Sequence, residues 1–208
     1  GVRTCSGLAT REEAVPTGAN IGGADGPGGQ EDAHPHAPTR AAAHVTSVMR
    51  AVGQAHVQTG APITVHTHPH SQSGLVAQKV FAEEGVDLTK VVIGHSGDST
   101  DLDYLCALAD AGSYLGMDRF GLDMLLPFEQ RVDTVVQLAK RGYAEKMVLA
   151  HDASCFIDWF SHEGKVAAQP NWNFRHISDD VLPALRERGV TEEQITTMLV
   201  DNPRRYFS

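Results

Sequence analysis

Four short, mostly apolar runs alternate with longer helical stretches along this chain, and this alternation limits the fold more than any other feature. The runs are expected to be β-strands over residues 62–66, 90–95, 113–118 and 146–152. Helices are expected over residues 39–59, 72–84, 99–111, 127–141, 178–188 and 191–201. Strands that alternate with helices form parallel sheets with the helices packed outside. The sequence therefore predicts an α/β fold built on a parallel sheet.

Residues 1–38 differ from the rest of the chain. They contain eight Gly and four Pro but no Phe, Trp or Tyr, and no helical or strand period is sustained there. Such a segment buries too little apolar surface to offset the entropy of ordering it. We expect an irregular, disordered segment over residues 1–38 and one folded domain over residues 39–208.

Composition excludes several classes of protein. The net charge of -9 argues against nucleic acid as the main partner, because phosphate binding requires a basic face. No apolar run approaches the roughly 18 residues of a membrane span. The three cysteines, Cys5, Cys106 and Cys155, are scattered and odd in number, so no disulfide framework is expected. A reducing cytoplasm is the predicted location.

Each expected strand ends at a polar residue. These residues are His66, His95, Asp118 and Asp152, at gaps of 29, 23 and 34 residues. Parallel strands joined by right-handed crossovers place their carboxyl ends on one side, which carries the active site in (β/α) barrels. Imidazole and carboxylate groups are ligands for zinc and similar ions, and a metal-bound water is a nucleophile near neutral pH. The pattern is consistent with a metal site, although a single histidine at a strand end more often has a structural role.

Several segments resemble the phosphotriesterase family of the amidohydrolase superfamily, and the resemblance extends over residues 41–208. They are ITVHTH at 63–68, VIGHSGDSTDL at 92–102, LGMDRFG at 115–121, VLAHD at 148–152 and DNPRRYF at 201–207. The family hydrolyses organophosphate triesters or lactones, and Arg119-Phe120-Gly121 looks like its lactonase branch. The resemblance implies a partial TIM (β/α)8 barrel, in which this chain supplies strands five to eight with their helices.

The resemblance also implies a binuclear divalent metal centre, with zinc as the expected ion and two ions per site in an intact member. By it, His66 and His95 are ligands of the more exposed metal. Asp152 is a ligand of the buried metal and serves the bridging hydroxide. Asp118 and Arg119 would lie beside the metals and relay the proton or hold the substrate. The expected partner is a small-molecule ester, lactone or organophosphate.

The chain departs from the family pattern in two places. The HxH pair of the first strand and the bridging lysine of the fourth are not recognisable, and His34-Pro35-His36 lies in the Gly/Pro-rich opening. A full barrel needs about 250 residues. Two hypotheses follow: a zinc-dependent hydrolase, or an inactive or truncated remnant with at most weak binding of one metal. The open edges of half a barrel predict either a homo-oligomer formed through them or poor solubility.

The stretch over residues 153–177 is expected to be a long loop. It would either cap the mouth of the site with apolar side chains or pack locally on the rim. Cys155, within this loop, is expected to be a buried structural thiol. Arg119 is expected either to bind a lactone or phosphoryl oxygen or to pair with Asp123.

Overall fold

The computed structural model describes residues 40–158 and 161–208 and contains one parallel sheet. Its strands, in the order in which they pair, are β1 (Ile63–His66), β2 (Val91–Gly94), β3 (Tyr114–Met117) and β4 (Met147–Leu149). The predicted α/β fold with a parallel sheet is confirmed. The predicted irregular segment over residues 1–38 lies outside the described residues.

The helix that precedes β1 and the three helices that connect the strands begin and end within three residues of the predicted bounds. They are α1 (Arg40–Thr59), α2 (Ser73–Glu83), α3 (Leu102–Asp110) and α4 (Phe128–Lys140). The largest difference is at α3, because Ser96–Asp98 first form a separate 3₁₀ turn. The carboxylate of Asp101 then caps α3 by accepting hydrogen bonds from the backbone N–H groups of Asp103 and Tyr104. Further 3₁₀ turns lie at Pro69–Ser71, Leu88–Lys90 and Ala144–Lys146.

The C-terminal region corrects two predictions. A short helix, α5 (His162–Ala168), lies inside the stretch expected to be a loop. The last helix continues to Phe207 instead of ending at 201, because a π-helical turn lets the chain pass Pro203 without breaking. The elements concerned are a π-turn at Ile177–Val181, α6 (Leu182–Glu187), α7 (Glu192–Thr196), a π-turn at Thr197–Asp201 and α8 (Asn202–Phe207).

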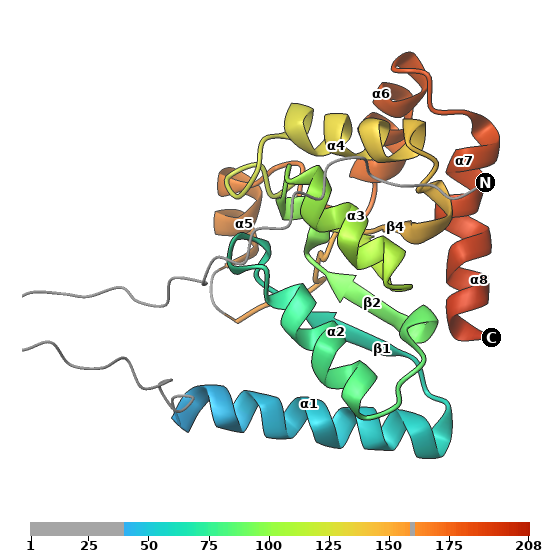
Figure 1. Ribbon diagram of the computed structural model, residues 1–208. Helices are drawn as coiled ribbons and strands as arrows, with labels where there is room; N and C mark the ends of the chain where they lie inside the picture. The colour runs from blue at the N-terminus through green and yellow to red at the C-terminus, as the bar shows by residue number, and fades with distance from the viewer. Residues whose placement is uncertain (1–39, 159–160) are drawn as a thin grey trace, which may run out of the picture.

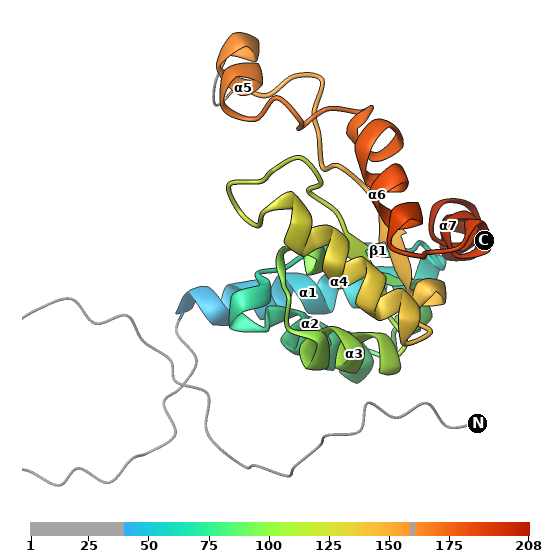
Figure 2. The same cartoon turned by 90° about the horizontal axis from the view of Figure 1, so that it is seen from above.

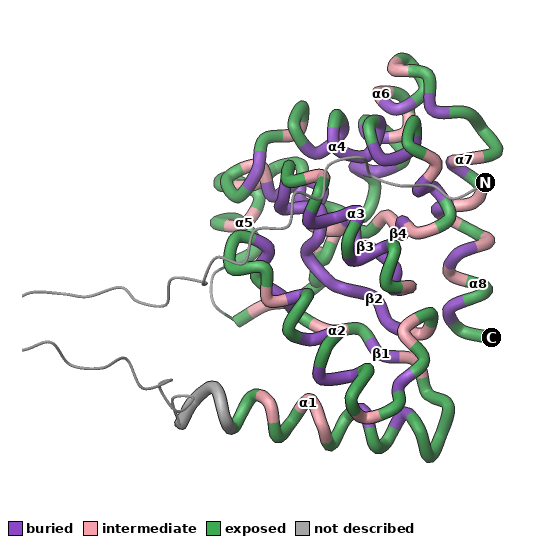
Figure 3. Tube along the Cα trace, viewed as in Figure 1, coloured by how far each residue is buried: buried purple, intermediate pink, exposed green. Residues whose placement is uncertain are grey.

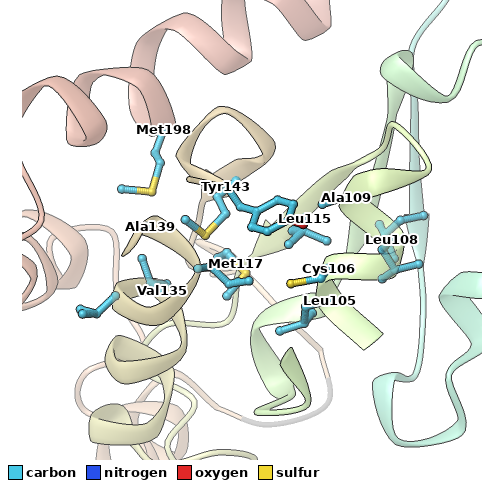
Figure 4. Close-up of a cluster of buried hydrophobic side chains, with 14 of the residues drawn as sticks. Leu105, Cys106, Leu108, Ala109, Leu115, Met117, Val135, Ala139, Tyr143 and Met198 are labelled. Carbon is cyan, nitrogen blue, oxygen red and sulfur yellow. The ribbon is translucent and has the colours of Figure 1, made fainter. Parts of the chain in front are cut away.

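Helices α2, α3 and α4 lie along one face of the sheet (Figures 1 and 2). The core fills the space between this face and the helices, and β2 is buried along its whole length (Figure 3). Figure 4 shows where α3, β3 and α4 meet, with Leu105, Leu115, Met117 and Val135 packed together. All four side chains are almost completely buried. This packing holds the strands in a fixed register and so fixes the positions at which they end.

On the opposite face of the sheet, a small buried cluster covers the amino-terminal part of the strands. Val92 and Tyr114 are paired across β2 and β3 and pack against Tyr206 of α8. The Tyr206 hydroxyl lies 2.8 Å from the Thr64 hydroxyl of β1. In Figure 1 the strands point away from α8 and toward the side of the molecule where α5 lies. Among the described residues, no helix is long and apolar enough to cross a membrane.

Candidate active site

The backbone turns sharply where three of the strands have ended. His95 follows β2 directly, Arg119 lies two residues beyond β3, and Asp152 lies three residues beyond β4. All three adopt the left-handed region, with φ values of 65°, 63° and 53°. Few residues other than glycine adopt this conformation, and strained backbone of this kind clusters at functional sites. In the described chain Gln72 is the one other non-glycine residue with a positive φ.

Two imidazoles and a carboxylate form a continuous array across the first three strands. Nδ1 of His66 lies 2.9 Å from Nε2 of His95, and the two rings meet edge to face. Nδ1 of His95 lies 3.0 Å from Oδ1 of Asp118, while the His95 backbone N–H donates to Oδ2 of Asp118 at 2.9 Å. A carboxylate that accepts from one ring nitrogen leaves the other nitrogen as the lone-pair donor, which is the arrangement typical of metal-bound histidine.

The pKa of His66 is lowered, chiefly by desolvation and next by the neighbouring His95 and Arg119. A lower pKa favours the neutral imidazole, the form that can bind a metal or accept a proton.

Glycines make room for the Asp118 side chain above the sheet. A Cβ at Gly116 would lie 2.9 Å from Oδ2 of Asp118 and 3.0 Å from the carbonyl oxygen of Ile93. A Cβ at Gly94 would lie 2.8 Å from the carbonyl oxygen of Val65. A side chain at Gly116 would therefore crowd the carboxylate that orients His95, whereas one at Gly94 would clash with the backbone of β1.

Arg119 connects the third and fourth strand ends to a buried ion pair. Its Nε donates to Oδ2 of Asp152 at 3.2 Å, and its Nη1 donates to Oδ2 of Asp98 at 2.9 Å. The other oxygen of Asp98 lies 2.7 Å from Nη2 of Arg131, a side chain with 1% exposure. The expectation that Arg119 could pair with Asp123 is wrong: among the described residues it pairs with Asp98 and Asp152.

Sequence reasoning missed both Asp98 and Arg131. Arg131 also donates to the carbonyl oxygens of Gly97, Asp118, Leu122 and Leu126. It thus ties α4 to the loops that follow β2 and β3. The available signals were an Asp three residues after His95 and an Arg on the apolar side of a helical pattern. Neither sequence signal shows whether these side chains form a buried hydrogen-bond network or lie on a solvated surface.

A pocket of about 790 Å³ opens beside this array. Its walls combine site residues with mostly apolar side chains from the loops after β3 and β4 and from α5. The lining residues are His66, Arg119, Leu122, Met124, Leu125, Asp152, Ser154, Ile157, Gly164, Lys165, Ala168, Gln169 and Trp172. The segment after β4 therefore supplies walls of this pocket. Within it, the expected burial of Cys155 is wrong, because its side chain is exposed.

The five predicted site residues lie together at one end of the sheet, but they do not form a complete metal site on their own. His66 and His95 are in contact, and Asp118 orients His95. The Asp152 carboxylate accepts a hydrogen bond from Arg119. Among residues 40–158 and 161–208, no three His, Cys, Asp or Glu side chains converge closely enough to hold one ion. The two imidazole nitrogens fit two positions of a coordination sphere, whereas catalytic zinc sites use three protein ligands.

The fold and the site define a parallel α/β protein whose polar cluster lies at the carboxyl ends of its strands. Residues 38–207 match the model of the phosphotriesterase family, and the chain belongs to that family. It is 59% identical over 163 residues to a phosphotriesterase homology protein of Mycobacterium tuberculosis H37Rv, covering 78% of this chain and 50% of the relative. It is 42% identical over 166 residues to an aryldialkylphosphatase of Saccharolobus solfataricus, covering 79% and 53%.

Solved structures agree with this relationship. The phosphotriesterase from Mycobacterium tuberculosis is 58% identical with a TM-score of 0.78, covering 79% of this chain and 51% of that one. The organophosphorus hydrolase from Deinococcus radiodurans is 33% identical with a TM-score of 0.70, covering 77% and 50%. The chain thus spans about half the length of the relatives it matches.

Proposed function

We propose that this chain carries half of the site of a metal-dependent hydrolase that acts on small organophosphate esters or lactones. The observation that supports this most directly is the His66–His95–Asp118 array, which opens into a pocket also lined by Arg119 and Asp152. One relative is named an aryldialkylphosphatase, and one similar structure concerns organophosphate hydrolysis activity engineered from a weak promiscuous lactonase. Substrates of these two kinds are therefore proposed for this chain.

The proposed metal ligands are His66, His95 and Asp152, and zinc is the proposed ion. A divalent metal would supply polarisation of the ester oxygen and an activated water. The described residues complete only part of such a site. The chain's own contributions are positional: Asp118 fixes the His95 ring, and Asp98 fixes Arg119 beside the pocket.

The proposal is tested by metal content after dialysis together with turnover of a lactone and of paraoxon. We expect His95→Ala to lose bound zinc and to lower kcat/KM roughly a hundredfold or more, since even indirect partners of metal ligands contribute 10- to 100-fold. His68→Ala is the matched control, because His68 is exposed and contacts Ser71 and His70 outside the array. Equal turnover in both variants would contradict the proposal.

A second candidate, an inactive or truncated remnant of such an enzyme, is favoured by one observation. No three ligand side chains converge within the described residues. This candidate predicts at most one weakly held zinc through His66 and His95, and no turnover. The same dialysis experiment separates the two, because a remnant would hold no metal at micromolar zinc.

We further propose that the four strands correspond to strands five to eight of a (β/α)8 barrel and that copies of the chain associate through the open edge of the sheet. Beside β1 lies an apolar groove of about 420 Å³, lined largely by α1 and β1. Val45 and Val48 in this groove are 54% and 63% exposed. Since the 163 matched residues are 50% of the relative, two copies of this matched part would equal one relative in length. A cytoplasmic location remains part of this proposal.

Self-association is tested by sedimentation velocity on Val48→Asp and Val57→Asp variants. Both residues are exposed on α1, but only Val48 is among the residues that line the groove. We expect the unmodified chain and Val57→Asp to sediment as dimers or larger species, and Val48→Asp to sediment as a monomer. A stable, monodisperse monomer of the unmodified chain would contradict the proposal.

A further inference from the structure

We propose that the pocket beside His66 has an anion-binding end, in which Lys165 binds a carboxylate or sulfonate group carried by the substrate. The inference rests on the proposed function, because it takes this pocket to be the substrate site. It adds a substrate class to that function: small esters or lactones that bear a negative charge, in preference to neutral ones.

The Lys165 ammonium is held in place by two neighbours that carry no negative charge. Its Nζ lies 4.5 Å from the centre of the Trp172 ring, and it donates to the carbonyl oxygen of Ser154 at 2.9 Å. The Trp172 ring is fixed in turn, because its Nε1 donates to the carbonyl oxygen of His151 and the residue is only 9% exposed. An ammonium group has three donors, so an anion in the pocket can accept from one that the Ser154 carbonyl does not use.

The charges of the pocket lining do not cancel. Arg119 and Lys165 contribute two cations, and Asp152 contributes one carboxylate. Arg119 is already shared between Asp152 and Asp98. By contrast, no acidic side chain of residues 44–158 and 161–208 forms an ion pair with Lys165.

An uncompensated cation in a pocket is unusual on a chain whose net charge is -9. The other lining side chains are mostly apolar, including Leu122, Ile157 and Ala168. Apolar walls limit competition from water, so a charge-assisted hydrogen bond to the ammonium gains strength there. An anionic group on the substrate would supply the missing negative charge.

The experiment measures binding rather than turnover, so its result is separate from that of the proposed function. Trp159 and Trp172 are the two tryptophans of the sequence, and a Trp159→Phe background leaves Trp172 as the fluorescent reporter. The probes are 4-nitrobenzoate and its neutral methyl ester, which both quench tryptophan emission. We expect the anion to bind about tenfold more tightly than the ester. Lys165→Met should remove this preference, and Lys165→Arg should retain it.

Lys79→Met is the control for a general change in charge, because Lys79 lies on α2 and does not line the pocket. It should leave both affinities unchanged. Equal binding of the two probes, or no binding of either, would overturn the proposal. So would a Lys165→Met variant that keeps the preference. A parallel loss of both affinities in Lys165→Met would assign the lysine to bracing the Trp172 ring, and would also overturn it. If the preference is found and no substrate is turned over, only the proposed function fails.

Discussion

Replacing Arg131 with methionine is expected to lower the free energy of unfolding by about 3–5 kcal/mol, which is the usual effect of removing one partner from a buried ion pair. The guanidinium is 1% exposed and lies 2.7 Å from Oδ1 of Asp98. It also satisfies backbone carbonyl oxygens in the loops after β2 and β3. Methionine fills a similar volume but donates no hydrogen bond, so Asp98 would keep only Arg119 as a partner for its charge.

Urea denaturation followed by circular dichroism measures this effect. Arg175→Met is the matched control: Arg175 pairs with Asp179 one helical turn away, with 82% of its side chain exposed, and should change stability by less than about 1 kcal/mol. The stability loss of Arg131→Lys should lie between those of Arg131→Met and Arg175→Met, because lysine keeps the charge but lacks the planar set of five donors. A similar loss in Arg131→Met and Arg175→Met would show that the buried network contributes little.

The fold was largely predictable because local patterns and tertiary packing agree in this chain. The β-branched and apolar run over residues 90–95 has the pattern of a strand buried on both faces, and Val91–Gly94 form such a strand. The convergence of His66, His95 and Asp118 followed from topology alone, because parallel strands end on the same side. Their roles as metal ligands or catalytic residues remain a prediction.

The network behind the site was not predictable, since it depends on contacts between distant segments. The helix FEQRVDTVVQLAK places Arg131 on its apolar side, but only the loop carbonyls and Asp98 explain how a charged side chain is accommodated there. Helix α5 was missed because HEGKVAA is short and exposed, with no apolar period to indicate it. The continuation past Pro203 depends on a π-helical turn that has no sequence signature.

Replacing Gly121 with alanine is expected to destabilise the protein by about 3 kcal/mol or more, combining backbone strain with overpacking. Gly121 has a φ of 94°, and a Cβ there would lie 2.2 Å from the carbonyl oxygen of Asn171 and 2.7 Å from the backbone nitrogen of Trp172. Both obstacles are backbone atoms, so no rotamer change relieves the clash. The segment at Asn171–Trp172 must move away from the loop after β3, and both segments contribute residues to the pocket lining.

Gly189→Ala separates the two causes. Gly189 has a φ of 86°, close to that of Gly121, but a Cβ there would meet no atom within 4 Å. This variant carries the conformational strain alone and should lose about 1–2 kcal/mol in urea denaturation. In Gly121→Ala the tryptophan emission should also shift to longer wavelength, because Trp172 would lose its packing beside the site. Equal stability losses in Gly121→Ala and Gly189→Ala, with unchanged tryptophan emission, would contradict this prediction. They would show that the loop after β3 moves to accommodate the added methyl group, so that this backbone contact does not fix the pocket wall.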